Sequence, residues 1–184
     1  MGTLSTSAWV LHDLGMAAGF GGSLYGKLAL HPAVKDVASQ EERGKLLYDT
    51  WHNYNYIDAI SLGAMAIPWF IGRTAISGRS IDRTTRGLVL AKDVLIGASI
   101  ITGIANMVSN KLIGEERPGG AVPFGPTGEP TPMTPPRATA LKRFLAVSGP
   151  LHTVFVGGVI GLTAALAMKS GKSSKWSFLS RFLP

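Results

Sequence analysis

Two ionisable side chains lie inside long apolar stretches of this sequence, where a charge is costly and a chemical role is common. Counted from Trp51 and Phe144, where the two stretches are expected to meet the membrane surface, Asp58 lies seven residues along and His152 eight. If both stretches enter a membrane from the same side, the two side chains lie at nearly equal depth. Tyr25 and Asn106, on two other apolar stretches, lie somewhat nearer the same surface. Because ionisable groups within a membrane usually face the protein interior, these four side chains predict one polar layer between helices.

Three kinds of chemistry fit this polar layer. Its side chains could form an internal hydrogen-bond network. They could instead form a site for a small polar ligand or a proton relay, or His152 could ligate haem or a metal ion. Pro150 adds an acceptor nearby, because proline lacks the N–H that would bond the carbonyl of Ala146 in a helix.

Haem ligation by two histidines needs both rings at matching depth on facing helices. His12 and His152 do not match, because their stretches start at opposite surfaces. His31 and His52 lie at loop boundaries, so they would reach His152 only if the loop folds down over it. We therefore expect no metal site and no cofactor, with haem b or a quinone-type molecule as the alternative.

The catalytic motifs with a recognisable spacing are missing. The chain has no cysteine, which excludes a thiolate metal site and a cysteine nucleophile. The sequence contains no HExxH, Gly-x-Ser-x-Gly or phosphate loop, and its glycine-rich runs lack the strand-to-helix context of a dinucleotide site. The sequence therefore predicts a protein that is not an enzyme.

A second group of ionisable residues lies near the other membrane surface. His12 and Asp13 open the first apolar stretch, and Lys92 and Asp93 lie a similar distance into the third. An ion pair between Asp13 and Lys92, with a hydrogen bond between His12 and Asp93, would offset the cost of burial. We expect a structural polar clasp here rather than a reactive site.

The elements that must position these groups are four apolar segments. Of the 184 residues, 46% are hydrophobic and only 16% are charged, below the ~25% charged residues of typical soluble domains. A membrane-crossing helix needs roughly 20 mostly apolar residues. The segments that meet this requirement are 8–30, 54–74, 88–110 and 144–168. The sequence therefore predicts an all-α fold, an integral membrane four-helix bundle, with one domain over residues 1–184.

Small residues recur at helical spacing in the first and last segments. Membrane helices associate through close backbone packing, which small residues permit. We expect packing faces at these positions: Gly15, Ala18, Gly19, Gly22, Gly26, Gly157 and Gly161. Their extent exceeds what four helices need for self-packing, which favours a further partner helix or a groove.

The connecting segments differ in character. Ser39 followed by Glu42 fits a capping box, so a juxtamembrane helix should run from about residue 40 into the second segment. Residues 114–136 hold seven of the eleven prolines, which predicts either an irregular tether or an extended arm docked on a neighbouring protein. Residues 169–184 alternate basic and aromatic side chains, as an interfacial or partner-docking tail would.

The basic residues favour contact with lipid headgroups. The net charge of +7 comes from side chains that flank apolar segments, which favours anionic lipid over nucleic acid as the partner class. The residues expected at headgroups are Arg79, Arg83, Arg86, Lys172, Lys175 and Arg181. The dense basic cluster in loop 73–87 predicts that this loop and both termini are cytoplasmic. A bacterial inner membrane is the expected location.

The layout resembles the four-helix membrane family that includes transmembrane protein 205 and a bacterial domain of unknown function. The resembling stretches are LHDLGMAAGFGGSLYGKLALHPAV, EERGKLLYDTWHNYNYIDAISLG, ANMVSN and FLAVSGPLHTVF. They cover about 8–112 and 140–168. His152 comes later in its segment than in that family, and the proline-rich loop and basic tail are additions. The resemblance implies the four-helix membrane fold and no particular activity.

These features favour a non-catalytic accessory or scaffold subunit of a larger membrane complex. Its partners would be membrane lipids and other integral membrane subunits. The alternative is a small cofactor-binding, transport or proton-relay protein that uses the polar layer of Tyr25, Asp58, Asn106 and His152.

Overall fold

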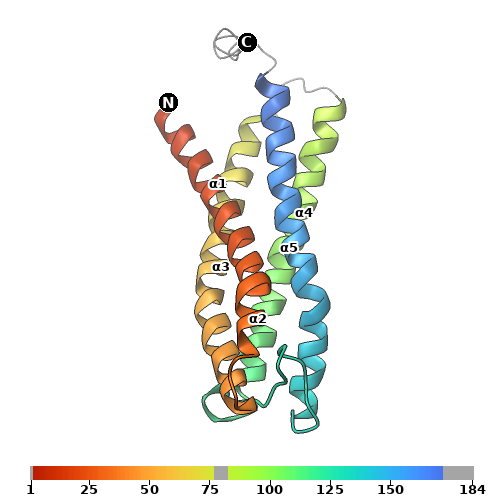
Figure 1. Cartoon of the computed structure of the whole chain (residues 1–184). Helices are drawn as coiled ribbons and strands as arrows, with labels where there is room; N and C mark the ends of the chain where they lie inside the picture. Colours follow the sequence, from red (N-terminus) through yellow and green to blue (C-terminus); the bar gives the residue numbers. More distant parts are fainter. Residues whose placement is uncertain (1, 77–82, 172–184) are drawn as a thin grey trace, which may run out of the picture.

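Four long helices lie side by side in this protein (Figure 1). The computed structural model describes residues 2–76 and 83–171. The elements are α1 Gly2–Tyr25, η1 Gly26–Leu30, α2 His31–Val34, α3 Gln40–Ile76, α4 Arg83–Gly114, η2 Pro118–Gly120 and α5 Pro136–Gly171. The described residues contain no strand, so the prediction of an all-helical chain with four long helices is confirmed.

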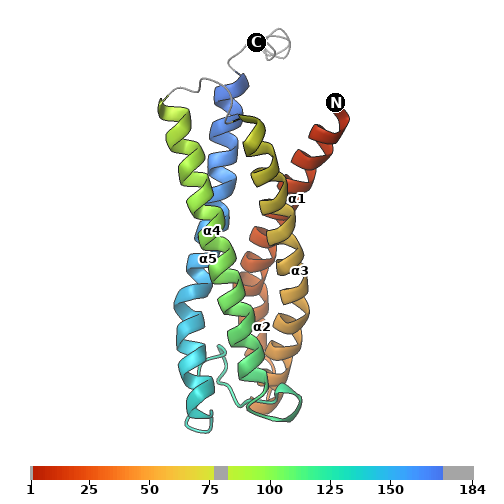
Figure 2. The ribbon, with the colours of Figure 1, turned by 180° about the vertical axis from the view of Figure 1, so that it is seen from behind.

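The helices alternate in direction, so α1 begins and α5 ends at the same end of the molecule (Figures 1 and 2). We call this the terminal end, and the opposite end, where residues 115–135 lie, the loop end. Two of the four helices, α4 and α5, are long and apolar enough to cross a membrane. The other two carry more polar residues, among them the stretch of α3 that precedes residue 54.

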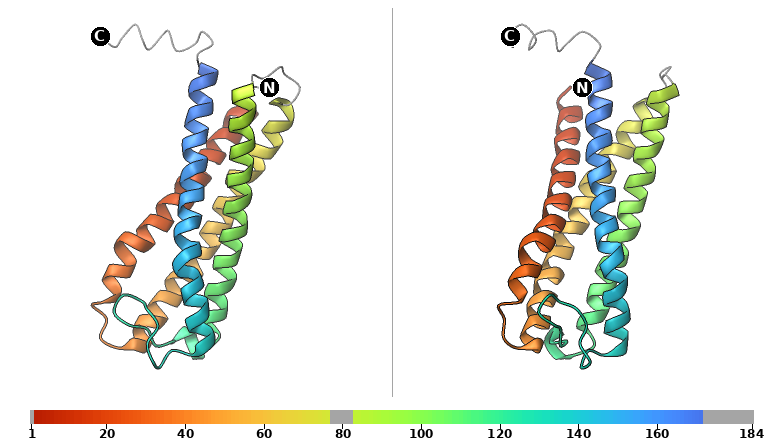
Figure 3. Two further views of the ribbon diagram at one scale, coloured as in Figure 1. Left: turned by 90° about the vertical axis from the view of Figure 1, so that its right-hand side faces the viewer. Right: turned by 45° about the vertical axis from the view of Figure 1, so that its right-hand side comes forward.

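The most extensive contacts join α1 to α3 and α4 to α5. A core near the terminal end brings these pairs together around Trp69, Met65 and Ile96, all nearly or fully buried. Toward the loop end, α1 and α5 diverge (Figure 3). The divergence leaves space between them for the cavity described below.

Glycines of α1 let its backbone approach α3. A Cβ on Gly15 would lie 2.6 Å from the carbonyl oxygen of Ser61, so no larger residue fits without a shift. Gly22 and Gly26 lie against the rings of Tyr54 and Trp51. The small-residue face of α1 is therefore filled by α3 of the same chain.

Not every predicted packing position lies at a contact. Gly19 faces Asp58 and Val156, and Gly157 faces Phe20, but the side chain of Ala18 is exposed. At 100° per residue Ala18 lies to one side of the face formed by Gly15, Gly19 and Gly22 of α1 and Gly26 of η1. Gly161 is also exposed, and nothing lies within 4 Å of the position of its Cβ. Neither position therefore packs against another helix in the part of this chain that the structure describes.

The start of α3 has the predicted cap. The backbone N–H of Glu42 donates to Ser39 Oγ at 3.3 Å, and the helix continues unbroken from Gln40 past the predicted second segment. The reciprocal side-chain contact of Ser39 is made with Glu41, at 3.0 Å, rather than with Glu42.

The proline-rich segment is neither a free tether nor an arm reaching away from the chain. It folds back over the loop end, where Val122 and Phe124 are buried against Val34, Leu47 and Ile113. The backbone N–H of Phe124 donates to the carbonyl of Gln40 at 3.2 Å. Proline had suggested only the lack of regular structure, whereas the two buried apolar side chains between the prolines determine where the segment docks.

Large apolar side chains cover the outside of all four long helices. Leu14, Ile60, Ile101 and Val154 are each more than half exposed. Among the basic residues predicted at headgroups, Arg83 and Arg86 are exposed at the start of α4. The others, Arg79, Lys172, Lys175 and Arg181, lie outside the described residues.

Candidate functional site: a cavity between four helices

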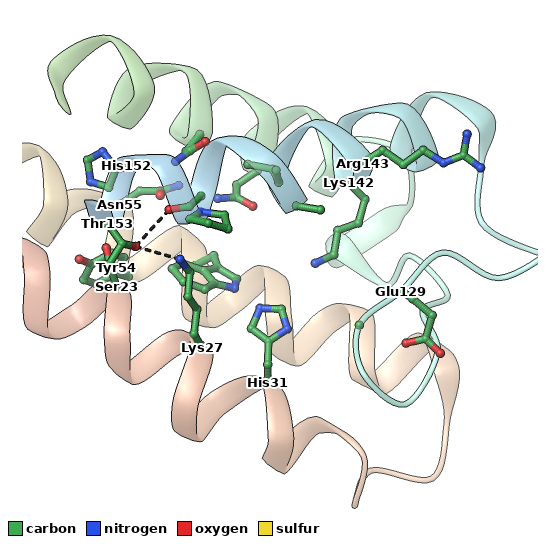
Figure 4. A pocket seen from close by; sticks show the side chains of 18 of the residues that line it. Ser23, Lys27, His31, Tyr54, Asn55, Glu129, Lys142, Arg143, His152 and Thr153 are labelled. Atoms are coloured by element: carbon green, nitrogen blue, oxygen red, sulfur yellow. Dashed lines mark hydrogen bonds between the residues drawn. The ribbon is translucent and has the colours of Figure 1, made fainter. Parts of the chain in front are cut away.

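A cavity of about 460 Å³ lies in the loop-end half of the molecule. Its walls come from α1 and η1 on one side, from α5 on the other, and from α3, α4 and residues 127–130. Figure 4 shows side chains of the residues that line it. Asp58, His152 and Asn106, three of the four residues of the predicted polar layer, line this cavity.

The inner end of the cavity is formed by Asp58 and His152. Asp58 Oδ1 and His152 Nε2 face each other at 3.5 Å, and both side chains are almost completely buried. Neither atom has a hydrogen-bond partner within the described part of the chain. A Cβ on Gly103 would lie 3.4 Å from the Asp58 carboxylate and 3.2 Å from the imidazole, so this glycine of α4 leaves room for the pair.

The contacts of the other ring nitrogen determine the tautomer of His152. Nδ1 lies 3.2 Å from the carbonyl oxygen of Ser99 and 3.1 Å from Thr102 Oγ1. The Thr102 hydroxyl donates to the carbonyl of Ala98 at 2.7 Å, so its oxygen is free to accept. Because a carbonyl can only accept, Nδ1 must carry the hydrogen. In the neutral ring Nε2 then presents a lone pair to a carboxylate oxygen, and two acceptors face each other.

This arrangement requires a hydrogen between Asp58 and His152. It can come from a proton held by the pair or from a donor group on a bound molecule. Buried polar atoms without partners are uncommon in native proteins and often mark a ligand or proton site. The chemistry available is thus hydrogen-bond acceptance and proton holding.

The two remaining members of the predicted layer behave differently. Asn106 Oδ1 accepts a hydrogen bond from Ser148 Oγ at 2.6 Å, which ties α4 to α5 beside the cavity. Tyr25 is 65% exposed and does not line the cavity, so its assignment to the layer was wrong. Tyr54 of α3 lines the cavity instead and donates to the carbonyl of Gly19 at 2.9 Å.

Basic side chains gather toward the loop end of the cavity. Lys27 of η1, His31 of α2 and Lys142 of α5 line it, and Figure 4 shows all three directed toward the space between them. Lys27 Nζ donates to Thr153 Oγ1 at 2.9 Å. Lys142 Nζ lies 4.9 Å from the centre of the Phe124 ring. Burial and the nearby Lys142 and Lys27 ammonium groups lower the pKa of His31.

Two other charged residues of the rim point elsewhere. The carboxylate of Glu129 accepts hydrogen bonds from the N–H and hydroxyl of Thr127, at 2.8 and 2.6 Å. These bonds lower the pKa of Glu129 and hold it on its own loop. Arg143 is exposed, and Figure 4 shows it directed away from the cavity.

The predicted polar clasp has different partners from those expected. Lys92 Nζ donates to His12 Nε2 at 2.9 Å and lies 3.8 Å from the centre of the Trp69 ring, while His12 Nδ1 contacts the carbonyl of Met65. Asp93 accepts a hydrogen bond from Trp69 Nε1 at 2.8 Å. Asp13 is exposed, because adjacent helical residues point about 100° apart and His12 takes the inward direction.

The histidines do not gather into a metal-ligating group. His52 lies between the rings of Tyr48 and Tyr56, and His31 packs near Trp51. Within residues 2–76 and 83–171, no three histidine or acidic side chains lie close enough together to hold a metal ion.

Sequence reasoning missed the basic groups of the cavity. Lys27 lies at the end of an apolar segment, and a lysine at such a position can indicate a binding site. The same position also fits a lysine side chain that extends to the membrane surface. Comparisons of the chain with protein-family models, with curated proteins and with solved structures found no match.

Proposed function

We propose that this protein is a non-catalytic integral membrane four-helix bundle that binds a small molecule in the cavity between α1 and α5. One observation carries the proposal: the buried, unpartnered Asp58 Oδ1 and His152 Nε2 at the inner end of an open cavity. A volume of about 460 Å³ falls within the 300–1,000 Å³ typical of small-molecule sites.

The surface supports the membrane part of the proposal. Exposed isoleucine, leucine, valine and phenylalanine side chains occur on all four long helices, and soluble proteins rarely expose apolar patches of such extent. With 24 residues, α1 is about 36 Å long, enough for a hydrocarbon core of about 30 Å. We propose a bacterial inner membrane as the location, and the basic residues at the start of α4 favour cytoplasmic termini.

The experiment compares two glycines of α5. Both Gly149 and Gly161 have open space where a Cβ would lie, but only Gly149 lines the cavity. The protein would be extracted into nanodiscs with its native lipids, and native mass spectrometry would detect bound molecules. We expect a bound molecule in the wild type and in Gly161→Phe, and its loss in Gly149→Phe. Equal occupancy in the two variants, or no bound molecule in the wild type, would refute the proposal.

A second candidate function is that of an accessory subunit in a membrane complex. The observation in its favour is the exposed Gly161, at which another helix could approach closely. The α1 glycines do not favour it, because α3 fills their face. Purification in mild detergent would identify stoichiometric partners that Gly161→Phe releases, and a protein that elutes alone would contradict this role.

A further inference from the structure

We infer that the cavity's ligand is an amphipathic anion whose phosphate or carboxylate group is held by Lys27, His31 and Lys142. This inference rests on the proposed function and adds the chemical class of the ligand. It is carried by three basic side chains that converge on one space without an acidic partner there.

Lys27 has unused hydrogen-bonding capacity. An ammonium group has three donors, and its one hydrogen bond in the described structure is to Thr153 Oγ1, at 2.9 Å. Thr153 in turn donates to the carbonyl of Gly149 at 3.1 Å. The bond therefore orients Lys27 toward the cavity wall of α5 and leaves its other N–H groups for a ligand.

Lys142 approaches the same space from the opposite wall. Its ammonium group lies beside the Phe124 ring of the docked loop, which offers a weak attraction and no hydrogen-bond acceptor. Other lysine and arginine side chains form ion pairs with carboxylates: Lys45 with Asp49, Lys111 with Glu115 and Arg137 with Glu116. Neither Lys27 nor Lys142 forms an ion pair within the described part of the chain.

Burial lowers the pKa of His31, and the charges of the two nearby lysines lower it further. Its Nδ1 is 3.4 Å from the carbonyl of Thr127, so the ring is oriented by the loop with its other nitrogen available. The nearest rim carboxylate, Glu129, is already bonded to Thr127. Clustered basic groups repel one another, and a phosphate or carboxylate that accepts charge-assisted hydrogen bonds would remove the repulsion.

Part of the wall favours an apolar portion of the ligand. Trp51, Leu145, Ala146 and Pro150 form apolar parts of the wall. Ala146 and Pro150 are also exposed on α5, so the cavity reaches the outer surface of the bundle beside α1. An acyl or alkyl chain can leave the cavity through this opening into lipid, while the anionic group stays with the basic residues.

A membrane phospholipid and a free single-chain acid share this chemistry. The binding assay uses protein in phosphatidylcholine nanodiscs and three probes: decyl phosphate, decyl phosphocholine and inorganic phosphate. We expect decyl phosphate to bind at least about tenfold more tightly than either of the others, since a charge-assisted hydrogen bond contributes more than one 1.4 kcal/mol tenfold step. Displacement by phosphatidylglycerol would identify a lipid as the source, and displacement only by single-chain acids would identify a free acid.

The variants separate charge from folding. Lys27→Gln with Lys142→Gln should remove the preference for decyl phosphate over decyl phosphocholine. The control is Lys45→Gln with Lys111→Gln, two exposed lysines of α3 and α4, which should keep it. Equal binding of decyl phosphate and decyl phosphocholine by the wild type, or inorganic phosphate binding as tightly, would overturn the inference.

Failure of the ligand class and failure of the proposed function give different results. If the wild type binds decyl phosphocholine as tightly as decyl phosphate and Gly149→Phe blocks both, the cavity binds ligands without regard to charge and only the inference fails. If Gly149→Phe and Gly161→Phe bind decyl phosphate equally, binding occurs outside the cavity and both fail.

Discussion

At the scale of single residues, hydrogen-bond directions decide what the inner end of the cavity can do. The carbonyl of Ser99 fixes the hydrogen of His152 on Nδ1, and this leaves an acceptor facing Asp58. A carboxylate oxygen and the lone pair of an imidazole nitrogen are both acceptors, so they repel each other unless a hydrogen lies between them. The pair is therefore a place where a proton or a donor group is held.

This geometry predicts the stability of variants at position 58. In Asp58→Asn the amide N–H can donate to His152 Nε2, so the unfolding temperature should stay at or above that of the wild type. In Asp58→Leu the imidazole has no partner, and the protein should lose about 1–3 kcal/mol of stability. Thermal unfolding followed by tryptophan fluorescence measures both. If the asparagine and leucine substitutions destabilise the protein equally, the assigned tautomer is wrong.

His31 predicts a pH dependence of ligand binding. Lys27 and Lys142 face it from η1 and α5, Trp51 packs near it from α3, and the Thr127 carbonyl accepts from it in the loop. Its pKa is lowered below 6.5, so in the empty protein it is neutral at pH 7. A bound anion favours the charged ring, and binding of an anionic amphiphile should therefore tighten as pH falls from 8 to about 5.

A decyl sulfonate probe measures this effect, because its charge is constant over this pH range. Below pH 7, His31→Gln should give a flat profile, whereas the change above pH 7 should remain, because burial lowers the pKa of Lys142 to about 8. A wild-type affinity that weakens toward low pH would contradict the assignment. The empty protein should show the opposite trend in stability. Because the unfolded chain takes up the His31 proton first, stability is lost as pH falls through 6.5 toward the lowered pKa.

At the scale of elements, a docked loop and a close helix contact shape the cavity. The π-helical turn η1 ends at Leu30, directly before His31 and Pro32 of α2. This wide turn places Lys27 and His31 on the cavity side. The proline-rich loop closes the loop end through Val122 and Phe124. It brings Thr127 to His31 and Phe124 to Lys142, so the basic group depends on the loop being docked.

The docking contact predicts a large effect of one methyl group. A Cβ on Gly44 would overlap the backbone carbonyl of Val122, which cannot move without displacing the loop. Gly44→Ala should lower the unfolding temperature and expose residues 121–135 to protease. Gly21→Ala is the control, because its Cβ would meet nothing within 4 Å and alanine favours a helix by about 1 kcal/mol over glycine. A Gly44→Ala protein as resistant to protease as Gly21→Ala would contradict the docked loop.

At the scale of the whole molecule, hydropathy and glycine spacing predicted much of the fold. Four helices, the cap of α3 and the proximity of Asp58 and His152 could all be expected from segment lengths and directions. The rotation of each helix about its axis could not. For this reason Tyr25, Ala18 and Asp13 were assigned inward although they are exposed, and Lys92 hydrogen-bonds to His12 rather than to the predicted Asp13.

The basic end of the cavity could not be predicted for a different reason. Lys142 lies far in sequence from Lys27 and His31, which are four residues apart, and the three side chains meet only in the folded bundle, at the end where the loop docks. The burial of Val122 and Phe124 that causes this docking has no periodic signal, since two apolar residues between prolines fit a free loop equally well. Long-range contacts of this kind depend on the folded structure as a whole.

The reactivity of introduced cysteines toward water-soluble reagents tests whether the cavity opens to water inside a membrane-embedded bundle. The chain has no cysteine, so Gly149→Cys and Gly161→Cys each place a single thiol on α5. In neutral-lipid nanodiscs without added ligand, their rates of modification by anionic and cationic water-soluble thiosulfonates would be compared. We expect Gly149→Cys to react, faster with the anionic reagent, and Gly161→Cys to be protected by lipid. Equal rates at the two positions would contradict a water-filled cavity in a membrane-embedded bundle.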